Sequence, residues 1–257
     1  MITSSDNQVY KHIAKLKLKK NRDKLGQYII EGPNLISEAL ENGGDIKYIL
    51  HSEGYEIEET SSFVLSIEHG LFCKLSDTDN PQGVLAIVNK KVYTEEEFFR
   101  PRETGDSNII VLDRLQDPGN IGTIIRTADA AGYMGAIVIK GTGDIYSPKV
   151  VRAATGSLFR LPVLLVDTPI QALGILKKYK KRIICTCLNC DQYYYESKMK
   201  DNIALVIGNE GNGVDKEFII NSDIQVKIPM DGKIESINAA VSAGILMYES
   251  VRQRWKE

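Results

Sequence analysis

The sequence has few of the residues that build disulfide-linked or metal-bound proteins: only 4 of its 257 residues are cysteines and 3 are histidines. Three cysteines share the run CTCLNC, where Cys187 and Cys190 form one CxxC pair, but no second pair completes a zinc site. We therefore expect no disulfide framework and no metal, in a reducing, cytoplasmic setting. Cys185, Cys187 and Cys190 are expected to be small core or surface residues, with a redox role as the less favoured alternative.

Long apolar runs are absent as well. No stretch approaches the roughly 18–20 apolar residues that cross a bilayer, and residues 1–15 lack the apolar core of a secretory signal. A hydrophobic content of 43% with 26% charged residues is typical of a soluble globular protein. We therefore expect a protein without a membrane partner.

Several common active-site motifs are missing. There is no GxxxxGK[ST] phosphate loop, and the runs GNIG and GNEGNG have the wrong spacing for a dinucleotide fingerprint. A nucleotide-dependent oxidoreductase is therefore disfavoured. The histidines, which are His12, His51 and His69, lie far in sequence from the glycine-rich runs, so a Ser–His–Asp arrangement is not expected.

The net charge of −2 gives no overall indication of nucleic-acid binding, but one segment is strongly basic. Residues 11–24 hold seven Lys and Arg against one Asp, and Val9, Ile13 and Leu16 give this basic segment one helical apolar stripe. Such a block can bind phosphates, and a solvated helix face is the alternative. The candidate RNA-binding residues are Lys15, Lys17, Lys19, Lys20, Arg22 and Lys24.

The apolar pattern predicts two α/β domains. Residues 1–91 alternate short strands with helices, and residues 92–107 carry charge, Pro and Gly without a sustained apolar period, as a linker does. In residues 108–257, continuous apolar runs alternate with amphipathic helices, which predicts a parallel sheet. A final long helix has an apolar stripe formed by Ile237, Val241, Ile245, Tyr248, Val251 and Trp255.

Small polar residues and glycines follow three of the predicted strands. DRLQDPGN (113–120) follows the first, GNEG (208–211) follows another, and IPMDG (228–232) with ESIN (235–238) follows a third. Ligands of parallel sheets bind beyond the carboxyl ends of the strands, and glycines allow backbone to approach a ligand. The three loops together therefore predict a pocket for a polar small molecule, although DPGN alone could be a turn and SIN alone an N-cap.

Three segments resemble a known family. DRLQDPGNIGTIIRTADAAG, ALVIGNEGNGV and VKIPMDGKIESINAAVSAGILMYE are similar to motifs one, two and three of the SpoU/TrmH family, in order and spacing. These are S-adenosylmethionine-dependent RNA ribose 2′-O-methyltransferases of the SPOUT superfamily. The resemblance implies a parallel α/β sheet with a deep trefoil knot and a homodimer with the active site near its interface. The last helix is expected to contribute to that interface. The segments RDKLGQYIIEGPNLISEAL and SDTDNPQGVLAIV resemble the family's substrate-binding domain, which is similar to small RNA-binding ribosomal proteins.

The family's site residues carry over to matching positions. The resemblance assigns the catalytic set to Asn120, Arg126, Glu210, Ser236 and Asn238. It assigns cofactor contacts to Gly208, Ile228 and Ile237, with Met230 and Thr186 as weaker candidates. Motif three often reads S-L-N-V-S in the family, whereas Ala240 stands here at the second serine, which leaves any role of a hydroxyl there in question.

The expected function is methyl transfer from S-adenosylmethionine to a ribose 2′-hydroxyl of structured RNA. The two-domain layout favours ribosomal RNA, and a tRNA substrate is the first alternative. A non-catalytic RNA- or ribosome-binding assembly factor is the second. The three tyrosines at 193–195 could stack on RNA bases, and an edge-strand role fits them equally well.

Overall fold

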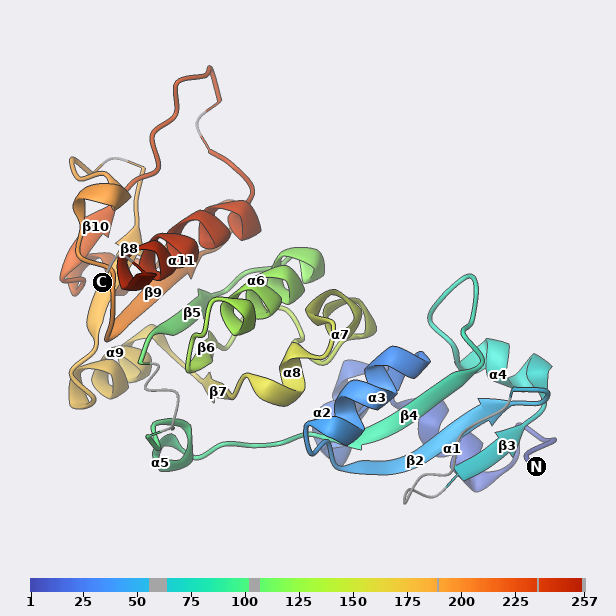
Figure 1. Cartoon of the computed structure of the whole chain (residues 1–257). Coiled ribbons are helices and arrows are strands. Elements are labelled where there is room, and N and C mark those ends of the chain that lie inside the picture. Colours follow the sequence, from blue (N-terminus) through green and yellow to red (C-terminus); the bar gives the residue numbers. More distant parts are fainter. Residues whose placement is uncertain (56–63, 102–106, 189, 235, 256–257) are drawn as a thin grey trace. The chain divides into compact units, whose positions relative to one another are not determined.

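The computed structural model describes the whole chain except residues 56–63, 102–106, 189, 235 and 256–257 (Figure 1). Part of the predicted linker, one end of a short strand that the apolar run FVLSI (63–67) predicts, and Glu235 therefore lie outside the described residues. The chain forms two compact units, one of Met1–Lys91 with Tyr146–Phe159 and one of Val92–Ile145 with Arg160–Glu257. In the described residues, no helix is long and apolar enough to cross a membrane.

The first unit is built on a four-stranded mixed sheet. Its strands, in spatial order, are β1 (Gln27–Glu31), β4 (Val84–Asn89), β2 (Ile46–Ser52) and β3 (Val64–Ile67). Only β2 and β3 pair in parallel. Alternating residues of β4 enter two separate cores, because successive side chains of a strand point to opposite faces. The helices of this unit are α1 (Gln8–Lys15), α2 (Lys19–Leu25), α3 (Pro33–Glu41), α4 (His69–Leu75) and α7 (Pro148–Ala154).

The basic N-terminal segment folds as two helices, α1 and α2, and the predicted apolar residues Val9 and Ile13 lie on α1 with Leu16 directly after it. The Arg22 guanidinium, which is 5% exposed, donates to the carbonyls of Leu16 and Lys17 at 2.7 and 2.8 Å. These carbonyls follow the last turn of α1, so Arg22 satisfies groups that a continuing helix would have bonded. Gly26 then ends α2 in the left-handed conformation, with φ 63°.

The second unit confirms the expected parallel α/β sheet. The order of its strands is β10 (Ile224–Val226), β8 (Arg182–Thr186), β9 (Ile203–Gly208), β5 (Ile109–Asp113), β6 (Gly135–Ile139) and β7 (Val163–Val166). Neighbouring strands pair in parallel throughout. β5 and β9 are buried along their whole length, as the continuous apolar runs predicted.

The other elements of the chain lie between and after these strands. They are α5 (Glu95–Phe98), α6 (Pro118–Ala130), α8 (Ser157–Arg160), α9 (Pro169–Lys178), η1 (Tyr194–Glu196), α10 (Lys216–Ile220) and α11 (Ala239–Trp255). α5 falls in the predicted linker, where Thr94 and Glu97 form a capping box and Phe98 is fully buried in the core of the second unit.

The long helix α11 packs beside α6 and β9, but not through the predicted stripe. Its buried face is formed by Ala240, Ala243, Leu246, Met247 and Ser250. Three residues of the predicted stripe are exposed instead: Val241 by 52%, Tyr248 by 50% and Trp255 by 87%. Because both faces of α11 are apolar, periodicity identifies the helix but not the side that packs inward.

Candidate active site

The carboxyl ends of β8, β9, β10 and β5 lie along one edge of the parallel sheet, because adjacent parallel strands end on the same side. The three polar loops of the sequence start there: 113–120 after β5, 208–215 after β9 and 227–238 after β10. Hydrogen bonds join the first loop to the second and to the third. The structure therefore brings together the three segments that the sequence placed at strand ends.

Glu210 connects the loop after β9 to the loop after β5. Its Oε2 accepts from the backbone amide of Gln116 at 3.1 Å, and its Oε1 accepts from the amide of Asp117 at 3.2 Å. Oε1 also accepts from Asn120 Nδ2 at 3.1 Å. The carboxylate thus lies at the N-terminus of α6, where exposed amides and the helix dipole favour a negative charge.

Asn120 joins Glu210 to Asn238. While its Nδ2 donates to Glu210, its Oδ1 accepts from Asn238 Nδ2 at 2.8 Å. Asn238 is the N-cap of α11, because its Oδ1 accepts from the amides of Ala240 and Val241 at 2.8 and 3.3 Å. The sequence SIN (236–238) therefore does provide the N-cap of a helix, through Asn238. The same residue also extends the hydrogen-bonded chain from Glu210 and Asn120.

The surroundings of Glu210 keep it ionised. Partial burial alone would raise the pKa of Glu210, but the hydrogen bonds from Asn120, Gln116 and Asp117 outweigh burial and hold the pKa below its usual value. A carboxylate with a lowered pKa and three donors is a weak base. Its chemistry here is to fix the positions of two loops and one amide side chain.

Arg126 and Ser236 stand apart from this cluster. Arg126 is exposed on α6, six residues after Asn120, which is roughly 9 Å along a helix axis. Within the part of the chain that the structure describes, no hydrogen bond or ion pair joins Arg126 to Asn120, Glu210 or Asn238. Ser236 is also exposed and precedes the N-cap by two residues. The surface positions of both residues leave them accessible to a substrate.

The predicted cofactor residues lie at the same edge of the sheet. Thr186 ends β8 and Gly208 ends β9, while Ile228 and Met230 follow β10 and Ile237 precedes α11. A Cβ added at Gly213 or Gly232 would meet nothing within 4 Å, so these loops leave open space beside their backbone. Backbone groups and partly exposed apolar side chains suit a flat adenosyl group, and they fit S-adenosylmethionine better than a polyphosphate.

Gly208 has a structural requirement of its own. A Cβ at this position would lie 2.2 Å from the Gly213 carbonyl carbon and 2.2 Å from the Val214 nitrogen. The loop closes on itself at this point, where Asn209 and Gly213 exchange backbone hydrogen bonds of 3.0 and 2.9 Å. Only glycine leaves room for that closure, so Gly208 shapes the loop that carries Glu210.

The six basic candidates of the first unit divide into two groups. Arg22 is buried against α1, and Lys17 Nζ donates to the carbonyls of Lys74 and Ser76 at 2.7 and 3.1 Å. Both therefore have bonds within the unit itself. The other four, Lys15, Lys19, Lys20 and Lys24, are exposed, and the side chain of none of them bonds to another of the described residues.

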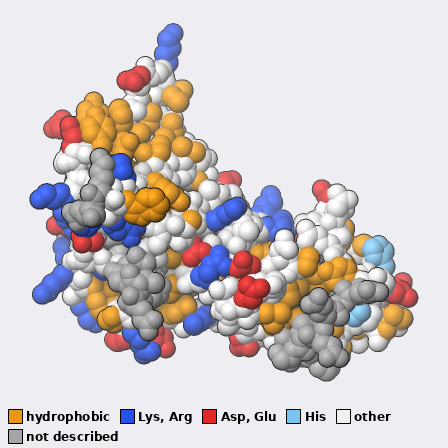
Figure 2. Space-filling view, viewed as in Figure 1, with side chains coloured by type: hydrophobic (Ala, Val, Ile, Leu, Met, Phe, Trp, Pro, Cys, Tyr) orange, Lys and Arg blue, Asp and Glu red, His pale blue; other side chains and the backbone are white. Residues whose placement is uncertain are grey.

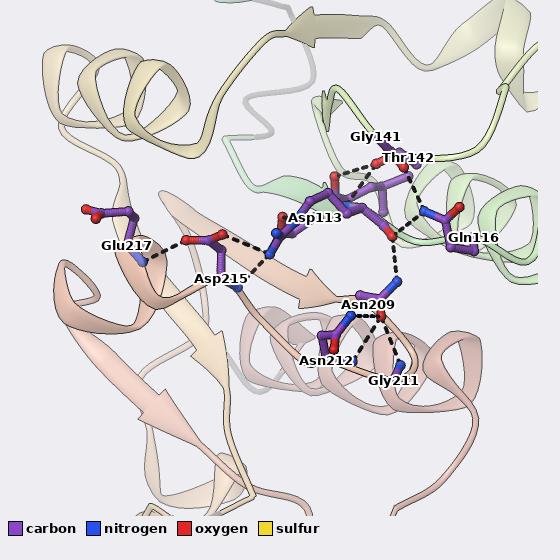
Figure 3. A network of polar contacts seen from close by, with 11 residues as sticks. Asp113, Gln116, Gly141, Thr142, Asn209, Gly211, Asn212, Asp215 and Glu217 are labelled. Atoms are coloured by element: carbon purple, nitrogen blue, oxygen red, sulfur yellow. Dashed lines mark hydrogen bonds and ion pairs between the residues drawn. The ribbon is translucent and has the colours of Figure 1, made fainter.

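Several residues of the site were not predicted from sequence, among them Gln116 and Asn209, which Figure 3 shows in their polar network. Asp117 caps α6 through the Asn120 amide at 2.8 Å, and Asn209 Nδ2 donates to the Arg114 carbonyl at 2.8 Å. Gln116 Nε2 donates to the carbonyls of Arg114 and Gly141 at 2.8 and 2.7 Å. Their position in the strand-end loops was the one feature of the sequence that pointed to them. Their individual hydrogen bonds depend on the path of the backbone.

Cys185 is buried in the core of the second unit, and Tyr193 and Tyr195 pack against each other at the edge of its sheet. Burial raises the pKa of Cys185 to about 12, so the thiol is not reactive at neutral pH. No group of three metal-ligating side chains occurs among the described residues. The rings of Tyr193 and Tyr195 stack at 5.4 Å, and Lys227 Nζ lies 5.0 Å from the Tyr193 ring. Tyr193 also forms a parallel bridge with Lys227, at the edge of the sheet.

Two family models match the chain. The model of the SpoU rRNA Methylase family matches residues 107–248, and the model of the MRM3-like substrate binding domain matches residues 7–86.

Curated relatives match nearly the full chain. The chain is 35% identical to the 23S rRNA (guanosine(2553)-2′-O)-methyltransferase RlmP of Bacillus subtilis, over 96% of this chain and 97% of the relative. It is 30% identical to a 23S rRNA (uridine(2479)-2′-O)-methyltransferase of Streptomyces viridochromogenes, over 98% of this chain and 92% of the relative.

Solved structures have the same fold. The SpoU methyltransferase AviRb from Streptomyces viridochromogenes, in complex with AdoMet, superposes with a TM-score of 0.89 and 30% identity, covering 97% of this chain and 98% of that one. A TrmH/SpoU tRNA modifying enzyme from A. aeolicus superposes with a TM-score of 0.52 and 29% identity, covering 59% of this chain and 77% of that one.

Proposed function

The chain belongs to the SpoU rRNA methylase family and is an S-adenosylmethionine-dependent RNA 2′-O-methyltransferase, and we propose that it acts on 23S rRNA through the site around Asn120, Glu210 and Asn238. The observation that carries the proposal is the hydrogen-bonded chain Glu210–Asn120–Asn238, which joins all three strand-end loops. The bound cofactor supplies an already activated sulfonium methyl group.

The length of the match favours ribosomal RNA over tRNA. Two relatives named for 23S rRNA cover 96% and 98% of this chain, whereas the A. aeolicus tRNA modifying enzyme covers 59% of it. That shorter match cannot include both units. The extra unit in this chain is matched by a substrate-binding model. The two 23S relatives modify different nucleotides, so the target nucleotide has to be mapped.

In the proposed mechanism, the residues of the chain position the ribose and stabilise charge. Glu210 accepts hydrogen bonds from the amides of Gln116 and Asp117 and from the side chain of Asn120, which fixes the loop after β5 against the loop after β9. Its lowered pKa makes it a poor acceptor for the proton of a ribose hydroxyl. That proton goes to an RNA phosphate or to water. Ser236, exposed near Asn238, orients the ribose.

Arg126 is assigned an electrostatic role. Guanidinium stays protonated in proteins, so Arg126 clamps the phosphate beside the target ribose and stabilises the developing alkoxide. Its exposed position on α6 is consistent with a group that meets RNA rather than one that holds the fold.

The proposal is tested by methyl transfer from labelled S-adenosylmethionine to 23S rRNA, 16S rRNA and tRNA transcripts. We expect label in 23S rRNA alone. Arg126→Ala is expected to abolish transfer and to leave cofactor affinity nearly intact. Equal loss of both in this variant rejects the role of Arg126. Transfer to tRNA alone supports the first alternative, and RNA binding without transfer supports an assembly factor.

The domain boundaries are part of the proposal. Residues 1–91 act as the RNA-binding domain, residues 92–107 as the connection and residues 108–257 as the methyltransferase domain. The exposed lysines Lys15, Lys19, Lys20 and Lys24 support an RNA-binding role for the first unit, because they form a local positive surface in a nearly neutral chain.

A homodimer is also proposed, with α11 at the interface. Val241, Tyr248 and Trp255 are exposed at helical spacing, and Ile234 before the helix is 63% exposed. Figure 2 shows hydrophobic side chains gathered on the second unit, over the region of α11 and the loop that precedes it. Exposed apolar groups of this kind mark association surfaces, and a second copy of the chain is the partner with a matching surface.

We also propose that the second unit contains a knot and that the protein works in the cytoplasm. The knot is supported by the crossovers in the strand order and by the likeness to SpoU methyltransferases. An experimental chain trace through residues 186–240 tests it. The proposed ribosomal substrate supports a cytoplasmic location, and cell fractionation tests it.

A further inference from the structure

A fully buried carboxylate lies at the end of the central strand β5. Asp113 is 0% exposed, and its Oδ1 accepts from Arg114 Nε at 2.9 Å. Its Oδ2 accepts from Arg114 Nη2 at 3.3 Å and from the backbone amide of Asp215 at 2.7 Å (Figure 3). A buried charge is stable only when it is paired and hydrogen-bonded. Here its partners include the residue that ends the loop 208–215.

The Arg114 side chain reaches that same residue. Its Nη2 lies 2.9 Å from Asp215 Oδ2, so one guanidinium bridges two carboxylates, as the planar fork of arginine can. Asp215 in turn caps α10, because its Oδ1 accepts from the Glu217 amide at 2.9 Å. The far end of the loop is therefore fixed to β5 by a charge-paired clamp.

The near end of the loop is fixed to Arg114 as well. The Arg114 carbonyl accepts from Asn209 Nδ2 at 2.8 Å, and the Arg114 amide donates to Thr142 Oγ1 at 3.0 Å. Arg114 adopts φ 58°, a left-handed conformation that is uncommon outside glycine. Asn209 Oδ1 accepts from the amides of Gly211 and Asn212 at 3.0 and 2.9 Å, which fixes the turn around Glu210.

We propose that Arg114 is a positioning residue, whose guanidinium between Asp113 and Asp215 holds the loop 208–215 so that Glu210 meets Asn120 and Gly208 borders the cofactor site. This inference rests on the proposed methyltransferase function. Two of the three guanidinium nitrogens of Arg114, Nε and Nη2, are bonded to the carboxylates of Asp113 and Asp215, which directs its charge to the loop. It acts on catalysis through Glu210.

Arg114→Gly is the sharpest test, because glycine keeps the left-handed backbone and the carbonyl bonded to Asn209 while it removes the guanidinium. We expect kcat to fall by roughly 10- to 100-fold, as when positioning groups around a site are lost. Hydrogen exchange at the Asp215 amide is expected to accelerate, and this readout needs neither RNA nor cofactor. Arg114→Lys is expected to restore part of the activity, since lysine reaches one carboxylate at a time.

A double-mutant cycle separates positioning from general damage. In a Glu210→Gln background, Arg114→Gly is expected to cost less than about threefold in kcat, because its effect passes through Glu210. Additive losses overturn the proposal. Asp215→Asn, which keeps the Asp113–Arg114 pair, provides the same cycle if Arg114→Gly does not fold.

The control is Arg160→Ala. Arg160 Nε pairs with Asp129 Oδ2 at 2.9 Å, and its side chain is 35% exposed against 38% for Arg114. Its activity is expected to match the wild type. A wild-type protein that transfers no methyl group contradicts the proposed function but leaves the exchange measurement valid. If the wild type is active and Arg114→Gly has the same kcat and the same exchange rate at the Asp215 amide, the role of Arg114 is contradicted. The proposed methyltransferase function is not affected by that result.

Discussion

Glu210 owes its position to the glycines on either side of it. Gly208 allows the loop to close against Gly213 and Val214, and Asn209 then turns the chain so that the carboxylate faces the N-terminus of α6. The glycine-rich run therefore shapes the loop itself rather than cradling a phosphate. The ionised carboxylate within it is bonded to backbone amides, which are the groups that a phosphate would otherwise use.

Gly208→Ala is predicted to displace the loop, because its Cβ would overlap backbone atoms 2.2 Å away. Overpacking of this kind costs about 1–3 kcal/mol, or roughly 5- to 150-fold in affinity if the loop forms the cofactor site. Calorimetric titration with S-adenosylmethionine measures the effect. Gly211→Ala is the control, since its nearest contact would be 3.6 Å away. Equal affinity of the two variants argues against a cofactor role for this loop.

The lowered pKa of Glu210 predicts a particular pH dependence of stability. A carboxyl with a lowered folded-state pKa adds stability above its unfolded pKa of about 4.3 and loses it as pH falls through the folded value. The gap in Tm between the wild type and Glu210→Gln is therefore expected to be constant above about pH 5 and to narrow in more acidic buffer. Thermal melts from pH 3 to 8 measure it, with exposed Glu217→Gln as the control. A gap that widens on acidification contradicts the proposed bonding.

At the scale of single residues, the sequence predicted part of the site. It selected Asn120, Glu210 and Asn238, which the structure joins by hydrogen bonds. It did not select Asp113, Arg114 or Asn209. Their contribution depends on the left-handed backbone of Arg114 and on hydrogen bonds to backbone groups, and neither can be read from residue type.

Among the elements, α2 offers the most exposed positive charge of the first unit. Lys19, Lys20 and Lys24 lie on this short helix and are exposed, whereas its Arg22 bonds to the end of α1. The basic segment thus serves both fold and surface. Its sequence could not separate the two roles, because the same residue types fill them.

Neutralising the three α2 lysines to glutamine is predicted to weaken RNA binding. If each contacts one phosphate, the slope of log affinity against log salt decreases by about 2 to 3, from roughly 0.7–0.9 per contact. Filter binding of rRNA fragments over a salt series measures it. The matched control replaces Lys177, Lys178 and Lys180, which lie at the amino edge of the other sheet. An unchanged slope in the α2 variant favours a solvated helix face.

The helix α11 illustrates what periodicity can and cannot predict. Its apolar spacing identified a long helix, and the structure has one from Ala239 to Trp255. The stripe chosen from sequence is partly exposed, since the face that packs inward uses small residues and Leu246 with Met247. The face that does not pack inward, which includes Val241 and Tyr248, is the surface assigned to the proposed dimer.

For the whole molecule, the sequence predicted the α/β class and the parallel sheet, because buried parallel strands are continuous apolar runs. It did not predict that residues 146–159 pack with the first unit. That grouping depends on contacts such as the Tyr28 and Tyr146 rings, whose centroids are 4.8 Å apart. Contacts between residues so distant in sequence leave no local pattern.

The proposed dimer gives a prediction at the same scale. Val241→Glu combined with Tyr248→Glu is expected to convert a dimer to a monomer, because each charge would enter the apolar interface twice. Light scattering coupled to size exclusion measures the mass. Ile170→Glu is the control, since Ile170 is a 66% exposed apolar residue on α9. A wild-type monomer, or a dimer that survives both substitutions, excludes this interface.

The central claim, ribose methylation of 23S rRNA, is tested most directly by mapping 2′-O-methyl groups across total RNA from cells that carry or lack the gene. The account predicts one 23S rRNA ribose that is methylated only when the gene is present. It also predicts that Arg126→Ala fails to restore the mark. Identical maps in the two strains, or a difference confined to tRNA, would contradict it.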